Sequence, residues 1–229
     1  MKTFSLTEVP IYCLSHKGND SRKIHIREME KNQKLNFHIV EGPASTERLP
    51  KYESGALTFV HLIMTHLKKI PFEPFVIIEN DVSVFSRKYE KFTYPDNADA
   101  IFIGISSWSV DLNTNNECGS LNTLKILQSE EFPHLFHDAN MLSTHGVFVA
   151  SRTYALHLAE TCLHTVLTKK IVWDVPLARN KLLYHVFALA TPIFYQDPVV
   201  NGGEFTGVEF TESTITTKEL TLLKQNKIN

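Results

Sequence analysis

The sequence predicts an α/β fold of three layers, with a mostly parallel central sheet flanked by helices. Two observations lead to this prediction. Short apolar runs alternate with segments of helical periodicity along the chain of 229 residues. Apolar residues make up 43% of the chain and aromatic residues 10%, which is enough for a full core and excludes disordered and fibrous classes. We expect a single domain over residues 1–229, in which residues 202–229 form a mobile loop and a terminal helix.

Two strands flank a helix at the start of the chain. Residues 9–15 (VPIYCLS) form a short apolar run that leads into a polar loop, as buried strands commonly do. Asp20 or Ser21 then supplies the cap of a helix, and the alternation at residues 36–40 predicts the second strand. A further helix is expected over residues 55–69, where apolar side chains recur three and four positions apart.

The remainder of the chain continues this alternation. Further strands are predicted at residues 75–78, 100–105, 147–150 and 190–195. Helices are expected to begin at Arg152 and Asp174. Residues 107–122 are polar and rich in turn-forming residues, so a surface loop or small excursion is expected there.

The charge, the cysteine content and the lack of a long apolar stretch argue against several classes of protein. Lys and Arg total 23 and Asp and Glu total 25, so the formal net charge of −2 argues against a nucleic-acid partner. The three cysteines are scattered and include no C-x-x-C pair, which favours a reducing compartment over a disulfide framework. No apolar stretch is long enough for a transmembrane segment, and we expect a cytoplasmic protein.

Two carboxylates follow the most apolar strand. The segment FVIIENDV places Glu79 and Asp81 where that strand ends, two positions apart and therefore on one side if the strand geometry persists. Carboxylate oxygens suit Mg²⁺ or Mn²⁺, whose remaining positions are often taken by phosphate oxygens and water. The same acidic pair is equally typical of a turn that caps the next segment, and the local pattern leaves both interpretations open.

The end of the first strand carries a second polar group. The segment CLSHKGNDSRK contains neither a dinucleotide-binding fingerprint nor a P-loop. Lys17 and Arg22 are nevertheless candidates for contacts with phosphate or ribose, helped by backbone N–H groups at the helix start. Each is also compatible with an ordinary solvated surface cation.

Segments in a fixed order over residues 10–197 resemble glycosyltransferase family 25, the lipopolysaccharide and collagen galactosyltransferase-like group with the GT-A fold. The matching segments are IYCLSHKGNDSRK, SGALTFVHLIMTH, IIENDV, THGVFVASRTYALHL, WDVPLARN and PIFYQD. Two positions depart from the family pattern. Asn80 replaces the middle acid of an E-D-D motif, so metal binding would rest on Glu79 and Asp81, and Val60 replaces the serine that commonly precedes His61.

The resemblance implies an inverting hexosyltransferase of glycan biosynthesis. The donor would be a nucleotide diphosphate sugar, with a UDP-sugar favoured, and the acceptor a hydroxyl of a glycan, a lipopolysaccharide or a protein. Mn²⁺ or Mg²⁺ is the expected cofactor, held by Glu79 and Asp81. Donor contacts are expected from Ser15, Lys17, Arg22, Gly55, His61 and Asn80.

The acceptor side is expected around three further residues and a base. His145, Gly146 and Trp173 are the candidate acceptor contacts, and Trp173 offers a flat apolar face to a sugar ring. His145 and His185 are equally possible third metal ligands. Inversion needs a base for the acceptor proton, and Asp174 is the candidate, although its position also suits a helix N-cap.

Two other functions compete with this prediction. A nucleotidyltransferase also places a metal between carboxylates and a nucleotide phosphate, but it releases pyrophosphate where a glycosyltransferase releases a nucleoside diphosphate. A catalytically silent nucleotide- or sugar-binding module is suggested by Asn80 and by the imperfect match around His61.

Overall fold

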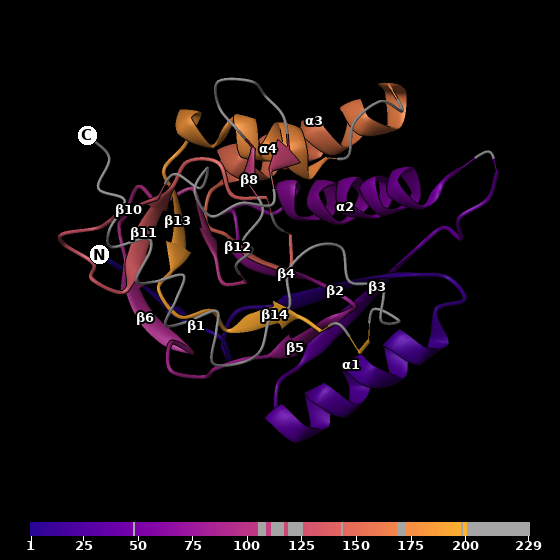
Figure 1. Ribbon diagram of the computed structural model, residues 1–229, viewed down its shortest axis with the longest axis horizontal. Coiled ribbons are helices and arrows are strands. Elements are labelled where there is room, and N and C mark those ends of the chain that lie inside the picture. The colour runs from indigo at the N-terminus through magenta and orange to yellow at the C-terminus, as the bar shows by residue number, and fades with distance from the viewer. Residues whose placement is uncertain are drawn as a thin grey trace.

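The computed structural model describes residues 1–47, 49–104, 109–110, 117–118, 126–142, 144–168, 173–197 and 199–200. Figure 1 shows its elements as a sheet with helices on both faces. The helices are α1 (Asp20–Gln33), α2 (Lys51–Leu67), α3 (Arg152–Thr168), α4 (Asp174–Arg179) and the short 3-10 helix η2 (Lys181–Leu183).

The central sheet has eight strands in the order β10-β11-β13-β7-β12-β4-β2-β3. Their bounds are β2 Ile11–His16, β3 Phe37–Gly42, β4 Phe75–Glu79, β7 Ala100–Phe102, β10 Ile126–Gln128, β11 Leu135–Asp138, β12 Gly146–Val149 and β13 Val186–Leu189. Strands β3, β2, β4, β7, β13 and β10 point one way, whereas β12 and β11 run against their neighbours. The sheet is therefore mostly parallel in strand direction, as expected.

Three two-stranded sheets accompany the central one. They pair β1 (Lys2–Ser5) with β6 (Lys91–Tyr94), β5 (Val82–Val84) with β14 (Phe194–Gln196), and β8 (Ser109–Val110) with β9 (Glu117–Cys118). The pair β5–β14 matters for the site, because β5 begins directly after the acidic segment that ends β4.

Two apolar cores lie on opposite faces of the sheet. Side chains alternate across β2 and β4, so Cys13 and Ile78 join the core beneath α1, whereas Leu14 and Ile77 join the core beneath α2, α3 and α4. Figure 1 shows the same division, with α1 on the lower side and the other helices above. The predicted three-layer α/β class is confirmed.

Several predicted boundaries are corrected by the structure. The cap of α1 is Asn19, without a side-chain hydrogen bond to the backbone, so neither Asp20 nor Ser21 has the predicted role. The strand predicted at 190–195 is present only at its end, as β14, whereas residues 190–193 connect it to β13, which was not predicted and belongs to another sheet. The polar segment 107–122 includes the β8–β9 pair, and its other residues lie outside the described ranges, as do residues 202–229.

No helix within the described residues is both long enough and apolar enough to cross a membrane. Cys13 and Cys162 are buried and not disulfide-bonded.

Candidate functional site

The polar segments predicted to carry chemistry meet at one edge of the sheet. Strands β2 and β4 are parallel, so Ser15 and His16 lie beside the turn that follows Glu79. Strand β12 is antiparallel to β4, with Gly146 opposite Ile78, and its first residues therefore reach the same edge. In this way His145, which precedes β12, comes to lie beside a strand end more than sixty residues earlier in the chain.

Asp81 and Asn80 are anchored on the α1 side of this edge. Arg22 Nη1 donates to Asn80 Oδ1 at 3.0 Å and to Asp81 Oδ2 at 3.2 Å, and Asn80 Nδ2 donates to Ser15 Oγ at 3.1 Å. The Asp81 side chain is 6% exposed. Its second oxygen, Oδ1, is buried without a hydrogen-bond partner in the described part of the chain, so the carboxylate retains one acceptor atom for a cation or a donor.

Glu79 belongs to the other side of the turn. It is the last residue of β4, and its Oε1 accepts a short hydrogen bond from Thr144 Oγ1. The strand geometry does not persist, since Asn80 and Asp81 form a turn before β5. Strand alternation therefore does not place Glu79 and Asp81 on the same side. The two carboxylates have different hydrogen-bond partners.

His145 lies within the electrostatic reach of two predicted site residues. Burial lowers the pKa of its imidazole below the ordinary value, while the negative charges of Asp81 and Asp174 act in the opposite direction. Both carboxylates are therefore close enough to influence His145. Asp174 is the first residue of α4 and the cap position belongs to Trp173, so the N-cap alternative for Asp174 is wrong.

Trp173 lies across the first turns of α2. A Cβ atom at Gly55 would come within 2.9 Å of Trp173 Cη2, and the ring centroids of Phe59 and Trp173 are 5.4 Å apart. His16 Nδ1 is 3.1 Å from Ser54 Oγ, whose own hydrogen goes to Pro43 O at 2.5 Å. Glycine at position 55 therefore lets the indole approach the helix backbone beside the end of β2.

Other predicted site residues are placed less centrally. Lys17 is exposed just beyond β2, and His61 is exposed on α2, six residues after Gly55. His185 is at the opposite edge of the sheet, because it precedes β13, which runs parallel to β7 and in the direction of β4. Its backbone N–H donates to Asp99 Oδ2 at 3.0 Å. The suggestion that His185 is a metal ligand beside Glu79 and Asp81 is wrong for this reason.

Gly146 and Gly104 let two strands approach closely. A Cβ at Gly104 would lie 2.9 Å from Gly146 N, and a Cβ at Gly146 would lie 3.2 Å from both Gly104 N and Phe194 Cδ2. The backbone at Gly146 therefore approaches the backbone at Gly104, which follows β7. This close packing at the start of β12 lies next to His145, the residue that precedes the strand.

We expect Gly104→Ala to destabilise the protein by about 1–3 kcal/mol, since the added methyl group meets backbone atoms that cannot turn away. Chemical denaturation of the variant measures this change. Gly18→Asn is a comparison in which only the positive φ of 89° opposes the substitution, because nothing lies within 4 Å of a Cβ there. An alanine variant at 104 as stable as the wild type would contradict the tight packing.

Several residues at this edge were not among the predicted site residues. Gln196 Nε2 donates to Asp81 Oδ2 at 3.3 Å, and Asp197 N donates to Asp81 O at 2.7 Å. Thr144 holds Glu79, and Ser83 and His25 lie below Asp81 on β5 and α1. The Q-D pair at the end of the PIFYQD segment was the available signal for the first two. Thr144 opens the segment THGVFVASRTYALHL, which was its signal, whereas the sequence offers none for Ser83 and His25.

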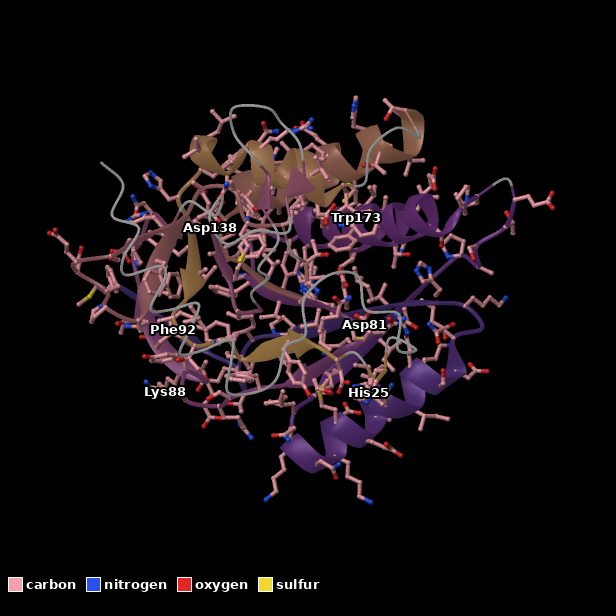
Figure 2. All side chains as sticks on the ribbon, viewed as in Figure 1. His25, Asp81, Lys88, Phe92, Asp138 and Trp173 are labelled. Carbon is pink, nitrogen blue, oxygen red and sulfur yellow. The ribbon has the colours of Figure 1, made fainter. Side chains whose placement is uncertain are left out.

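No three or more His, Cys, Asp or Glu side chains among the described residues are grouped to hold a metal ion. Figure 2 shows Asp81 between Trp173 and His25 in this view. The arrangement thus offers one buried carboxylate oxygen of Asp81, the guanidinium of Arg22 and the imidazole of His145.

Neither a protein-family model nor a curated protein matches this sequence. Solved structures do match, and these neighbours are glycosyltransferases.

One is a glycosyltransferase involved in the glycosylation of the major capsid of PBCV-1, with 10% identity, a TM-score of 0.44, and coverage of 94% of this chain and 99% of that chain. Another is WbbM, a bifunctional glycosyltransferase in its apo form, with 12% identity and a TM-score of 0.42. The match covers 80% of this chain and 39% of WbbM. Both TM-scores are below 0.5, so these similarities carry no conclusion about function.

Proposed function

We propose that this chain is a glycosyltransferase that moves a sugar from a nucleotide diphosphate sugar to a hydroxyl acceptor. The observation that supports this most directly is the buried Asp81 carboxylate at the carboxyl edge of β4, with one oxygen lacking a hydrogen-bond partner among the described residues. The ordered motif resemblance over residues 10–197 supports the reaction class. In open α/β sheets, ligands bind at this edge.

The residues present fit a divalent cation that is held mainly by its substrate. Mg²⁺ is commonly bound by one or two carboxylates, with phosphate oxygens and water completing its coordination, so a cluster of three protein ligands is not required. Asp81 Oδ1 would hold the ion, with Glu79 as the candidate second carboxylate. The bound cation, Mn²⁺ or Mg²⁺, would neutralise the charge of the departing nucleoside diphosphate.

The neighbouring side chains can orient the donor. Arg22 is 16% exposed and joins Asp81 to Asn80, so its guanidinium is positioned to meet the diphosphate beside the carboxylate. Ser15 holds Asn80 in turn. Lys17, exposed at the end of β2, can add a second positive charge toward the same phosphates.

The acceptor would enter on the α2 and α4 side. Trp173 offers an apolar ring face, and Asp174 would take the proton of the acceptor hydroxyl. As that oxygen forms its bond to the anomeric carbon, the bond between this carbon and the phosphate oxygen breaks on the opposite face. His145, whose pKa is lowered by burial, can form a hydrogen bond with the sugar.

A ligand screen tests the proposal directly. We expect nucleoside diphosphates, UDP foremost, to raise the melting temperature of the protein when Mn²⁺ is present. A ligand at about 100 times its Kd adds about 2.7 kcal/mol, which is about 5–10 °C for a chain of this size. Incubation with the matching nucleotide sugar should then release the nucleoside diphosphate.

Other outcomes of this screen favour the competing functions. Release of pyrophosphate from a nucleoside triphosphate and a sugar phosphate would indicate a nucleotidyltransferase. Metal-dependent binding without any transfer or donor hydrolysis would indicate a binding module. A protein that melts cooperatively and shows no shift with any nucleotide would contradict the proposed function.

We expect Asp174→Asn to retain metal-dependent UDP binding and to lose transfer by about 10²–10⁴-fold, because only proton removal from the acceptor is affected. Steady-state transfer and the thermal shift with UDP and Mn²⁺ measure the two properties separately. Asp96→Asn is a matched control, since Asp96 is exposed and pairs with the N-terminus. Full transfer by Asp174→Asn would assign the base to another residue.

A further inference from the structure

The segment after β14 holds Asp81 by both its backbone and its side chain. Strand β14 pairs with β5 so that Gln196 lies opposite Val82, the residue after Asp81. Asp197 N donates to Asp81 O at 2.7 Å, and Gln196 Nε2 donates to Asp81 Oδ2 at 3.3 Å. Neighbouring residues therefore fix the carbonyl and the carboxylate of Asp81 together.

A second set of hydrogen bonds holds this segment in place. Ser83 Oγ donates to Asp197 Oδ2 at 2.7 Å. His25 Nε2 is 2.8 Å from Val82 O and 3.3 Å from Ser83 Oγ. A backbone carbonyl only accepts, so Nε2 carries the hydrogen and the imidazole of α1 donates to β5. The chain of donors runs from α1 through β5 to Asp197.

These contacts decide which oxygen of Asp81 remains available. Gln196 and Arg22 both donate to Oδ2, whereas Oδ1 is buried without a hydrogen-bond partner in the described part of the chain. Rotation of the carboxylate would break two hydrogen bonds of a side chain that is only 6% exposed. The carboxylate is therefore oriented before any ligand arrives.

We propose that Gln196, Asp197, Ser83 and His25, the Asp81 brace, are positioning residues that present Asp81 Oδ1 to the cation of the metal–nucleotide complex. This inference rests on the proposed function. The brace does not touch the ligand. It acts by preorganising the carboxylate, in the way that hydrogen-bonded partners orient the ligands of metal sites.

The test compares Mn²⁺ binding by wild-type protein, Gln196→Met and Gln33→Met in the presence of saturating UDP. The EPR signal of unbound Mn²⁺ reports the affinity without any need for turnover. Methionine keeps the length of glutamine but removes the donor, so Gln196→Met should weaken Mn²⁺ binding about 10–100-fold. Gln33 ends α1, away from the site, and its methionine variant should bind as the wild type does.

Ser83 supplies a second variant in case Gln196→Met does not fold. Ser83→Ala removes the donor to Asp197 and should weaken Mn²⁺ binding about tenfold, whereas Ser83→Thr keeps the hydroxyl, suits a strand and should restore it. A purely structural role would lower the melting temperature of Ser83→Ala and leave the Mn²⁺ affinity unchanged.

The outcomes separate this inference from the proposed function. If the wild-type protein binds Mn²⁺ with UDP and the brace variants bind Mn²⁺ with the same affinity, the positioning role alone is overturned. Wild-type protein without any Mn²⁺ binding would overturn both. Weakened binding in Gln196→Met and Ser83→Ala, with recovery in Ser83→Thr, supports the brace.

Discussion

Replacing Asp81 by asparagine is expected to abolish metal-dependent nucleotide binding and to reduce transfer at least about 100-fold. The substitution keeps the size of the side chain and removes the negative charge. Changes to residues that merely support a metal ligand cost 10–100-fold, so the loss of a ligand should cost at least the upper figure. The thermal shift produced by UDP and Mn²⁺ together, and the release of UDP from its sugar donor, measure both effects.

A matched control separates the site from general charge effects. Asp20→Asn makes the same chemical change in the first turn of α1, where Asp20 is 83% exposed and pairs with Lys23 at 3.4 Å. Surface ion pairs of this kind contribute little, so binding and transfer should be unchanged. An Asp81→Asn protein that folds, binds UDP only with Mn²⁺ and transfers sugar at the wild-type rate would remove Asp81 from the proposed metal site.

His145 and His185 differ in a property that the local sequence does not predict, namely the edge of the sheet at which each lies. Each histidine directly precedes a strand, so the local patterns are alike. Strand β12 runs against β4 and strand β13 runs with it, which places the two histidines at opposite edges of the sheet. Apolar periodicity predicts that a strand exists but not its direction, which is decided by pairing between distant segments.

The same reasoning explains which parts of the site could be predicted. Asp81 follows the apolar strand β4, and Arg22 lies in the first turn of α1. The end of a strand and the start of a helix can both be recognised from the local sequence. Gln196 meets Asp81 across 115 positions of sequence, through a strand pair outside the central sheet. Its role depends on the β5–β14 pairing and could not be derived from spacing. Gln196 was therefore missed although it also ends a strand, because its contact with Asp81 depends on tertiary pairing.

Loss of the buried ion pair between Lys181 and Asp138 is expected to have the largest effect on stability. The two side chains are 1% and 0% exposed, with Lys181 Nζ 2.5 Å from Asp138 Oδ2 and 2.6 Å from Met141 O. The ammonium also lies 3.6 Å from the centroid of the Phe102 ring. Asp138, labelled in Figure 2, thus compensates a charge that has no access to water.

Asp138→Asn should destabilise the protein by about 3–5 kcal/mol, because it leaves the ammonium buried beside a neutral amide. For a chain of this length, the melting temperature should fall by about 6–20 °C. Asparagine can keep the oxygen that accepts from the backbone N–H groups of Asn140 and Met141, so the loop itself retains its hydrogen bonds. The charge is then the main difference between the variants.

A double-mutant cycle with Lys181→Met isolates the interaction. Methionine is similar in volume and uncharged, so the double variant Lys181→Met/Asp138→Asn should be clearly more stable than the sum of the two single losses predicts. Urea denaturation of the four proteins gives the coupling energy. Additive losses would show that packing, and not the pairing of charges, makes these residues important.

The pH dependence of Asp138→Asn provides an independent check with a definite sign. Burial lowers the pKa of Lys181 below 10.5, and the negative charge of Asp138 opposes this effect, so the asparagine variant should lower it further. The unfolded chain then binds more protons than the folded chain at pH values between the two pKa values, and stability rises with pH in that range. Asp138→Asn is expected to have a lower free energy of unfolding than the double variant Lys181→Met/Asp138→Asn. This deficit in stability should therefore shrink between pH 7 and about 10. A deficit that grows over the same range would mean that the folded variant raises the pKa of Lys181 above its unfolded value, so that the ammonium is stabilised without Asp138.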